Sequence, residues 1–144
     1  DRYINRTTDV EYITGETEKY YIKDHTLEEL REFNYGYNFN IDGNFPYREV
    51  VGENNIDKPS VYKTLGLSIT TLDELFSEFY DLNPDLLFII EIKDKEARGE
   101  LASKIFYETL LKYPKYLGNV VASSFNKEVE KHFKENYPNL ILMN

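Results

Sequence analysis

The pattern of apolar and polar residues changes near residue 68. Before it, two short apolar segments of strand character, residues 10–14 and 20–23, alternate with turn residues. Thr26 and Glu29 then have the spacing of a capping box, which predicts a short helix ending near residue 33. The first part of the chain is therefore expected to hold short elements joined by turns.

From residue 69 onward, helical and strand patterns alternate. Thr71 and Glu74 form a second capping box, which predicts a helix to about Tyr80. Three apolar runs of strand length follow, separated by two segments of helical periodicity: runs 86–90, 120–122 and 140–142, and helices 96–113 and 127–136. This alternation is typical of a parallel sheet with crossover helices. The continuous run 86–90 further predicts a strand that is covered on both faces.

The sequence predicts an α/β fold, and two architectures suit it. One is an open, flavodoxin-like sheet, and the other is part of a closed eight-unit barrel, which needs roughly 200 residues or more. The chain has 144 residues and opens at Asp1, inside what resembles a loop. We therefore expect it to be a piece of a longer protein.

Composition narrows the classes of function. Apolar residues make up 41% of the chain, which suits a buried core, and no apolar run reaches the ~18 residues of a membrane span. The net charge of −9 argues against broad nucleic-acid binding, where a basic face is expected. The absence of Cys excludes disulfides and thiolate metal sites. The compartment stays open, either cytoplasmic or extracytoplasmic.

The strongest candidate chemistry lies at the end of the first parallel strand. Side chains alternate along a strand, so Glu91 and Lys93 share one side while Ile90 and Ile92 share the other. Functional sites of parallel α/β folds form at the carboxyl ends of strands. A carboxylate beside an ammonium suits a phosphate ester bound across a divalent metal. The alternative is an ion pair with a structural role alone.

Two weaker candidates accompany this pair. Ser124 follows the next strand, where its hydroxyl could face the same mouth as Glu91; Ser124 or Asn126 could instead cap the next helix. Arg6 lies in a polar loop, where it could hold a phosphate or pair with an acid.

Two further features argue against other chemistries. Residues 38–49 nearly fit a calcium-loop pattern, but Pro46 interrupts it and Asp42-Gly43 is more simply a hairpin turn. His25 and His132 do not lie at strand ends, so neither is a convincing general acid or base.

An ordered set of short segments, which are weak one by one, carries a family resemblance. They lie at residues 1–8, 26–30, 69–75, 90–93 and 124–125. Together they resemble the glycerophosphodiester phosphodiesterase family. The resemblance implies part of a (β/α)8 TIM barrel, spanning residues 1–144, with a small insertion within about residues 9–68 and βα barrel units at 69–144.

The resemblance also implies an activity. The family hydrolyses glycerophosphodiesters to sn-glycerol 3-phosphate and an alcohol, usually with a divalent cation such as Ca²⁺ or Mg²⁺. Glu91 matches its metal-binding glutamate, Lys93 matches the lysine beside the phosphate, and Arg6 matches an arginine to which we give no firm role. The family's two catalytic histidines and a further acidic metal pair would precede Asp1. The isolated chain is therefore expected to have an incomplete metal site and to be inactive, and its parent could be attached to a membrane.

Two rival functions remain open. A related barrel could cleave phospholipid head groups instead of a small glycerophosphodiester. Alternatively, a truncated barrel could be a non-catalytic module that binds a partner or self-associates through unpaired sheet edges.

Overall fold

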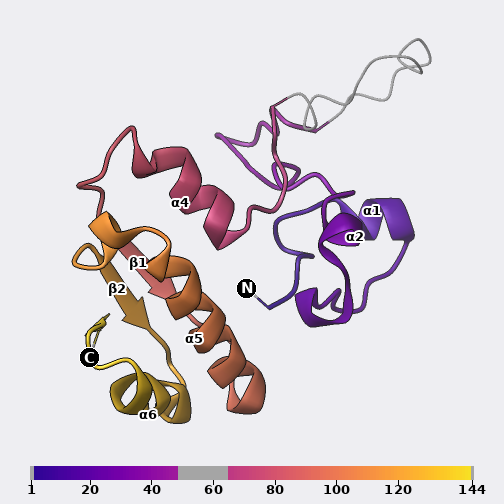
Figure 1. The fold of residues 1–144 in the computed structure, drawn as a ribbon. Coiled ribbons are helices and arrows are strands. Elements are labelled where there is room, and N and C mark those ends of the chain that lie inside the picture. The colour runs from indigo at the N-terminus through magenta and orange to yellow at the C-terminus, as the bar shows by residue number, and fades with distance from the viewer. Residues whose placement is uncertain (1, 49–64, 144) are drawn as a thin grey trace. The chain divides into compact units, whose positions relative to one another are not determined.

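The computed structural model describes residues 2–48 and 65–143, which form two compact units divided after Ile69 (Figure 1). In chain order the elements are α1 (Val10–Thr14), η1 (Ile22–Asp24), α2 (Leu27–Leu30), α4 (Leu72–Tyr80), β1 (Phe88–Glu91), α5 (Glu96–Leu111), η2 (Pro114–Tyr116), β2 (Val120–Ser123), α6 (Lys127–Asn136) and β3 (Ile141–Leu142). Within the described ranges, no helix combines the length and the apolar character that a bilayer span requires.

The second unit is a three-stranded parallel sheet with crossover helices, as the alternating pattern predicted. The strands lie in the order β1-β2-β3 and every pair is parallel. Helix α5 connects β1 to β2, and α6 connects β2 to β3 (Figure 1). In β1 and β2 the register pairs Phe88 with Val120 and Glu91 with Ser123. This register fixes which residues of the two strand ends lie level with one another.

The core of this unit lies on one face of the sheet. Phe88 and Ile90 of β1 pack with buried side chains of β2 and of the three helices: Val120, Ala122, Phe76 of α4, Phe106 and Leu110 of α5, and Val129 and Phe133 of α6. Because the strand order runs without reversal, right-handed crossovers place the connecting helices on the same side. An arc of a singly wound barrel has this arrangement.

The opposite face of the sheet is uncovered among the described residues, which corrects one prediction. Leu87 is 75% exposed and Ile89 is 66% exposed, although the run 86–90 was expected to be covered on both faces. An apolar run shows that both faces of the strand are apolar. Whether the second face is covered depends on residues distant in sequence. Helices α4, α5 and α6 all pack on the Ile90 face.

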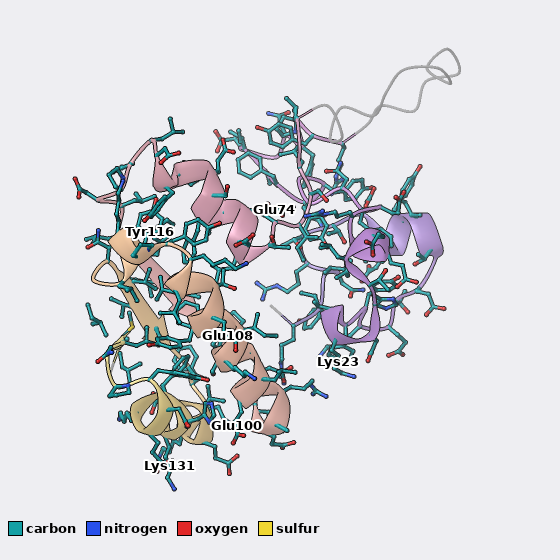
Figure 2. All side chains as sticks on the ribbon, in the orientation of Figure 1. Lys23, Glu74, Glu100, Glu108, Tyr116 and Lys131 are labelled. Carbon is teal, nitrogen blue, oxygen red and sulfur yellow. The ribbon has the colours of Figure 1, made fainter. Side chains whose placement is uncertain are left out.

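An aromatic cluster joins α4 to the sheet. Tyr116 is fully buried, and its ring lies 5.1 Å from that of Phe88 and 5.5 Å from that of Phe76, measured between centroids. Its hydroxyl donates to the carbonyl of Asn83 at 3.1 Å. Burial raises the pKa of Tyr116 above its ordinary value, because the charged phenolate is disfavoured there. The labelled Tyr116 in Figure 2 lies at this junction.

The first unit has its own small core, and two strand predictions there are wrong. Residues 10–14 form the helix α1, whose Val10 is buried with Ile4 and Leu30. Thr14 Oγ1 donates to the Val10 carbonyl at 2.7 Å, so a β-branched residue closes a helical turn rather than extending a strand. Of residues 20–23, Tyr21 makes one isolated bridge, and the chain then turns into η1.

The local turn and capping predictions hold in both units. Thr26 and Glu29 form both hydrogen bonds of a capping box at the start of α2, which ends at Leu30 rather than near residue 33. Thr71 and Glu74 do the same at the start of α4. Residues 41–44 form a tight hairpin turn, with an Ile41–Asn44 bridge across Asp42-Gly43.

Glu49, the last position of the near-calcium pattern, lies outside the described residues.

Gly99 permits the close approach of α5 to its neighbours. A Cβ atom there would lie 2.5 Å from Val129 Cγ2 and 2.9 Å from the carbonyl oxygen of Asp94. We therefore expect Gly99→Ala to lower the free energy of unfolding by about 1–3 kcal/mol through overpacking. Urea denaturation measures this change.

Gly118→Ala is the matched control, because a Cβ at residue 118 meets no atom within 4 Å. We expect it to change the free energy of unfolding by less than about 0.5 kcal/mol. Equal stability of the two variants would contradict the steric argument.

Candidate functional site

The candidate site begins at Glu91, the last residue of β1. Ile90 and Ile92 pack against the helix-covered core, so the alternation of the strand places Glu91 and Lys93 on the open face. Lys93 Nζ donates to Glu91 Oε2 at 2.7 Å. The Lys93 side chain is 45% exposed and that of Glu91 is 28% exposed. The structure thus brings together the two residues that the sequence singled out.

Hydrogen bonds beyond the strand ladder hold the segment that carries this pair. The Ile92 amide donates to the Ser123 carbonyl at 2.8 Å. Ser124 Oγ donates to the Ile92 carbonyl at 2.9 Å. Ile92 is therefore bonded at both its N–H and its C=O to the end of β2. Because Ile92 lies between Glu91 and Lys93, these two bonds fix the backbone from which both charged side chains extend.

Ser124 is buried, so its side chain does not lie where it could face a ligand. It is 4% exposed, and its Oγ also accepts a hydrogen bond from the Asn126 amide at 3.1 Å. Capping belongs to Asn126, whose Oδ1 accepts from the amides of Glu128 and Val129 at 3.1 Å each. Of the two residues proposed as caps, Asn126 is the one that caps α6, and Ser124 ties the two strand ends together.

Asp94 is a further polar residue of this edge that the sequence analysis did not single out. Its Oδ1 accepts from the Lys95 amide at 2.9 Å, and its Oδ2 accepts from Arg98 Nε at 2.9 Å. The next residue but one, Glu96, has φ of 55°, a left-handed conformation that is uncommon for a residue with a side chain. The i,i+4 spacing of Asp94 and Arg98 was the signal that could have found this contact.

Arg6 and His25 belong to the first unit, and His132 belongs to the second. Arg6 belongs to the first unit, so its role at this site stays a prediction. His25, also in the first unit, stacks on Tyr20 with ring centroids 3.6 Å apart. His132 lies on α6, where its Nδ1 is 3.2 Å from Asn136 Nδ2. Neither histidine follows a strand, as the sequence indicated.

The described residues do not complete a metal site. They contain no group of three or more His, Cys, Asp or Glu side chains placed to hold an ion. Glu91 supplies carboxylate oxygens, the ligand type that Ca²⁺ and Mg²⁺ prefer, but such ions take six or more oxygen ligands. Glu91 therefore suits one ligand position of a site that would need further donors.

A protein-family model, the glycerophosphoryl diester phosphodiesterase family, matches residues 1–143. The chain belongs to this family. The resemblance carried by the short segments is thereby confirmed, and a search of curated proteins found no match. A phosphodiesterase of this family has a TIM-barrel-like α/β fold, and the three-stranded parallel sheet is consistent with part of one.

The geometry of this edge predicts a cost for removing the Ser124 hydroxyl. Ser124→Ala leaves the Ile92 carbonyl and the Asn126 amide without the bonds that Oγ makes. We expect a loss of about 1–3 kcal/mol in the free energy of unfolding, together with faster hydrogen exchange of amides near Ile92. Urea denaturation and amide exchange monitored by NMR measure the two effects.

Ser123→Ala is the control, since it removes a hydroxyl from the adjacent, more exposed position of β2. We expect its free energy of unfolding to stay within about 0.5 kcal/mol of the unmodified protein. A Ser124→Ala variant as stable as Ser123→Ala would show that the hydrogen bonds of the Ser124 hydroxyl do not stabilise the fold.

Proposed function

We propose that this chain is part of a metal-dependent glycerophosphodiester phosphodiesterase that releases sn-glycerol 3-phosphate and an alcohol. The observation that carries the proposal is the Glu91–Lys93 pair, 2.7 Å apart at the carboxyl end of β1 and on the open face of the sheet. Family membership supports phosphodiester hydrolysis as the reaction class.

Lys93 is the proposed phosphate-binding residue. A phosphodiester carries one negative charge, and the Lys93 ammonium is a compact cation with three donors and a 45% exposed side chain. It would contact the non-bridging oxygens and offset the charge that develops on them during attack.

Glu91 is the proposed ligand of a divalent cation, either Ca²⁺ or Mg²⁺. A carboxylate 2.7 Å from Lys93 would repel a phosphodiester bound at the same ammonium unless further positive charge lies nearby. A cation held partly by Glu91 would supply that charge and polarise a phosphoryl oxygen. We propose that its other ligands lie outside the described residues.

The groups that transfer protons are proposed to lie outside residues 1–144. Phosphodiester hydrolysis needs a base to assist attack and an acid to protonate the leaving alkoxide. The chain has two histidines: His132 lies on α6, and His25 stacks on Tyr20 in the first unit.

One alternative function is favoured by a specific observation. The open face of the sheet bears the exposed Leu87, Ile89 and Ile141, which another chain could cover. A self-associating module would show a mass in solution that rises with concentration, whereas a phosphodiesterase segment would not require this.

A phospholipid-head-group phosphodiesterase would instead share the Glu91–Lys93 chemistry and differ in substrate.

The first functional prediction concerns the full-length protein that contains this chain. We expect Glu91→Gln and Lys93→Met each to lower kcat/KM for glycerophosphocholine by about 10²–10³-fold. Lys93→Met removes a positive charge at the phosphate, and Glu91→Gln removes a ligand of the proposed cation. A chelator should abolish activity, and added Ca²⁺ or Mg²⁺ should restore it. Release of glycerol 3-phosphate is the measurement.

The fold should survive these substitutions. An ion pair this exposed contributes about 0–1 kcal/mol to stability, so lost activity would not reflect unfolding. Glu100→Gln, on the exposed side of α5 (Figure 2), is the matched control and should retain full activity. Undiminished activity of Glu91→Gln, or activity indifferent to chelation, would refute the metal role of Glu91.

The second functional prediction concerns residues 1–144 alone. We expect no glycerol 3-phosphate above background from this segment, because it would lack the proton-transfer groups and the remaining metal ligands. Turnover by the segment that disappears in its Glu91→Gln variant would overturn this expectation and place the whole catalytic site within these residues.

A further inference from the structure

The buried hydroxyl of Ser124 contacts the segment that carries the candidate pair. Ser124 is 4% exposed, and its Oγ donates to the Ile92 carbonyl at 2.9 Å. The same oxygen accepts from the Asn126 amide at 3.1 Å. A hydroxyl has a single proton, and here that proton is directed at the Ile92 carbonyl while a lone pair faces the Asn126 amide. The two bonds together fix the direction in which the hydroxyl donates.

The carbonyl that accepts this bond belongs to the peptide unit between Ile92 and Lys93. A peptide unit is planar, so its orientation depends on two soft dihedral angles, here ψ of Ile92 and φ of Lys93. The strand register ends where Glu91 pairs with Ser123, so this peptide unit lies beyond the ladder. The Ser124 hydroxyl therefore orients a peptide unit that the ladder does not reach.

The backbone at Glu91 is held by a different contact. The peptide unit between Glu91 and Ile92 donates its N–H to the Ser123 carbonyl at 2.8 Å. This is a backbone bond, which no side-chain substitution at residue 124 removes. Loss of the Ser124 hydroxyl would therefore disturb the backbone at Lys93 more than the backbone at Glu91.

The chain that follows Lys93 is anchored as well. Asp94 accepts from the Lys95 amide through Oδ1 and from Arg98 Nε through Oδ2, both at 2.9 Å. Lys93 thus lies between a residue bonded to the end of β2 and a residue bonded to α5. A lysine side chain is a flexible four-carbon stem, so a fixed backbone is needed to place its ammonium accurately.

We propose that Ser124 is a positioning residue for Lys93. Its hydroxyl orients the peptide unit between Ile92 and Lys93, and thereby the ammonium that contacts the phosphate of the substrate. This inference rests on the proposed phosphodiesterase function. Because Ser124 is buried, it acts through Lys93 and touches no substrate atom. Removing a group that orients a binding residue typically costs about 10–100-fold in activity.

The test is a double-mutant cycle in the full-length protein, with kcat and KM measured for glycerophosphocholine. We expect Ser124→Ala to lower kcat by about ten- to a hundred-fold and to change KM by less than about three-fold. In a Lys93→Met background the same substitution should lower kcat by less than about two-fold, because the group that the hydroxyl positions is gone. In a Glu91→Gln background its full effect should persist, because the Ser123 carbonyl still holds the backbone there.

Two further substitutions at residue 124 keep the test decisive. Ser124→Thr retains the hydroxyl and should keep kcat within about five-fold of the unmodified protein. Ser124→Cys has a thiol of similar size that donates only weakly. It takes the place of Ser124→Ala in the cycle if the alanine variant does not fold.

Asn126→Ala is the matched control in the same turn. It removes the side-chain cap of α6 but leaves the bond from Ser124 to the Ile92 carbonyl in place. We expect its stability to fall while its kcat stays within about two-fold of the unmodified protein.

The outcomes separate this inference from the proposed function. An equal loss of kcat from Ser124→Ala in the native and the Lys93→Met backgrounds would mean that the hydroxyl only supports the fold. That result, an undiminished kcat in Ser124→Ala, or an equal loss in Asn126→Ala would overturn the inference while the phosphodiesterase function stands. A full-length protein that cleaves neither glycerophosphocholine nor glycerophosphoinositol would overturn the proposed function and this inference with it.

Discussion

The parallel pairing of β1 with β2 is the constraint on which the candidate site depends. It sets Glu91 level with Ser123 at the ends of the two strands. The bonds of Ile92 to the end of β2 then carry the alignment one residue beyond the strands. The core on one face of the sheet, which includes Phe76, Phe106 and Phe133, stabilises this strand pairing. Burial on that side leaves the charged residues on the other.

Much of the fold could be predicted because its signals are local. A capping box requires two residues three apart, so Thr71 and Glu74 predict the start of α4 whatever the rest of the chain contains. The failure at residues 10–14 has the opposite cause. Val10 belongs to a small core with residues distant in sequence, and burial there outweighs the strand preference of its β-branched side chain. Coverage of the second sheet face is likewise a non-local property that the run 86–90 could not show.

The candidate site was predictable to the same extent. Parity along a strand is a property of the strand alone, so Glu91 and Lys93 could be assigned to one face from the sequence. The role of Ser124 could not, because its hydroxyl reaches the carbonyl of Ile92, 32 residues earlier. A serine before a helix favours a capping interpretation, and only the juxtaposition of two strand ends shows that the hydroxyl bonds across them.

The charge balance of the site explains why its chemistry extends beyond this pair. Glu91 and Lys93 neutralise each other at 2.7 Å, so together they attract an anion only weakly. A phosphodiester bound at Lys93 would therefore need further positive charge, and the described residues contain no group of three or more metal-ligating side chains that would hold a cation. The carboxylate is informative for this reason. At the carboxyl end of a strand, on the face that the helices leave open, its negative charge would hinder phosphate binding unless a cation were bound to it.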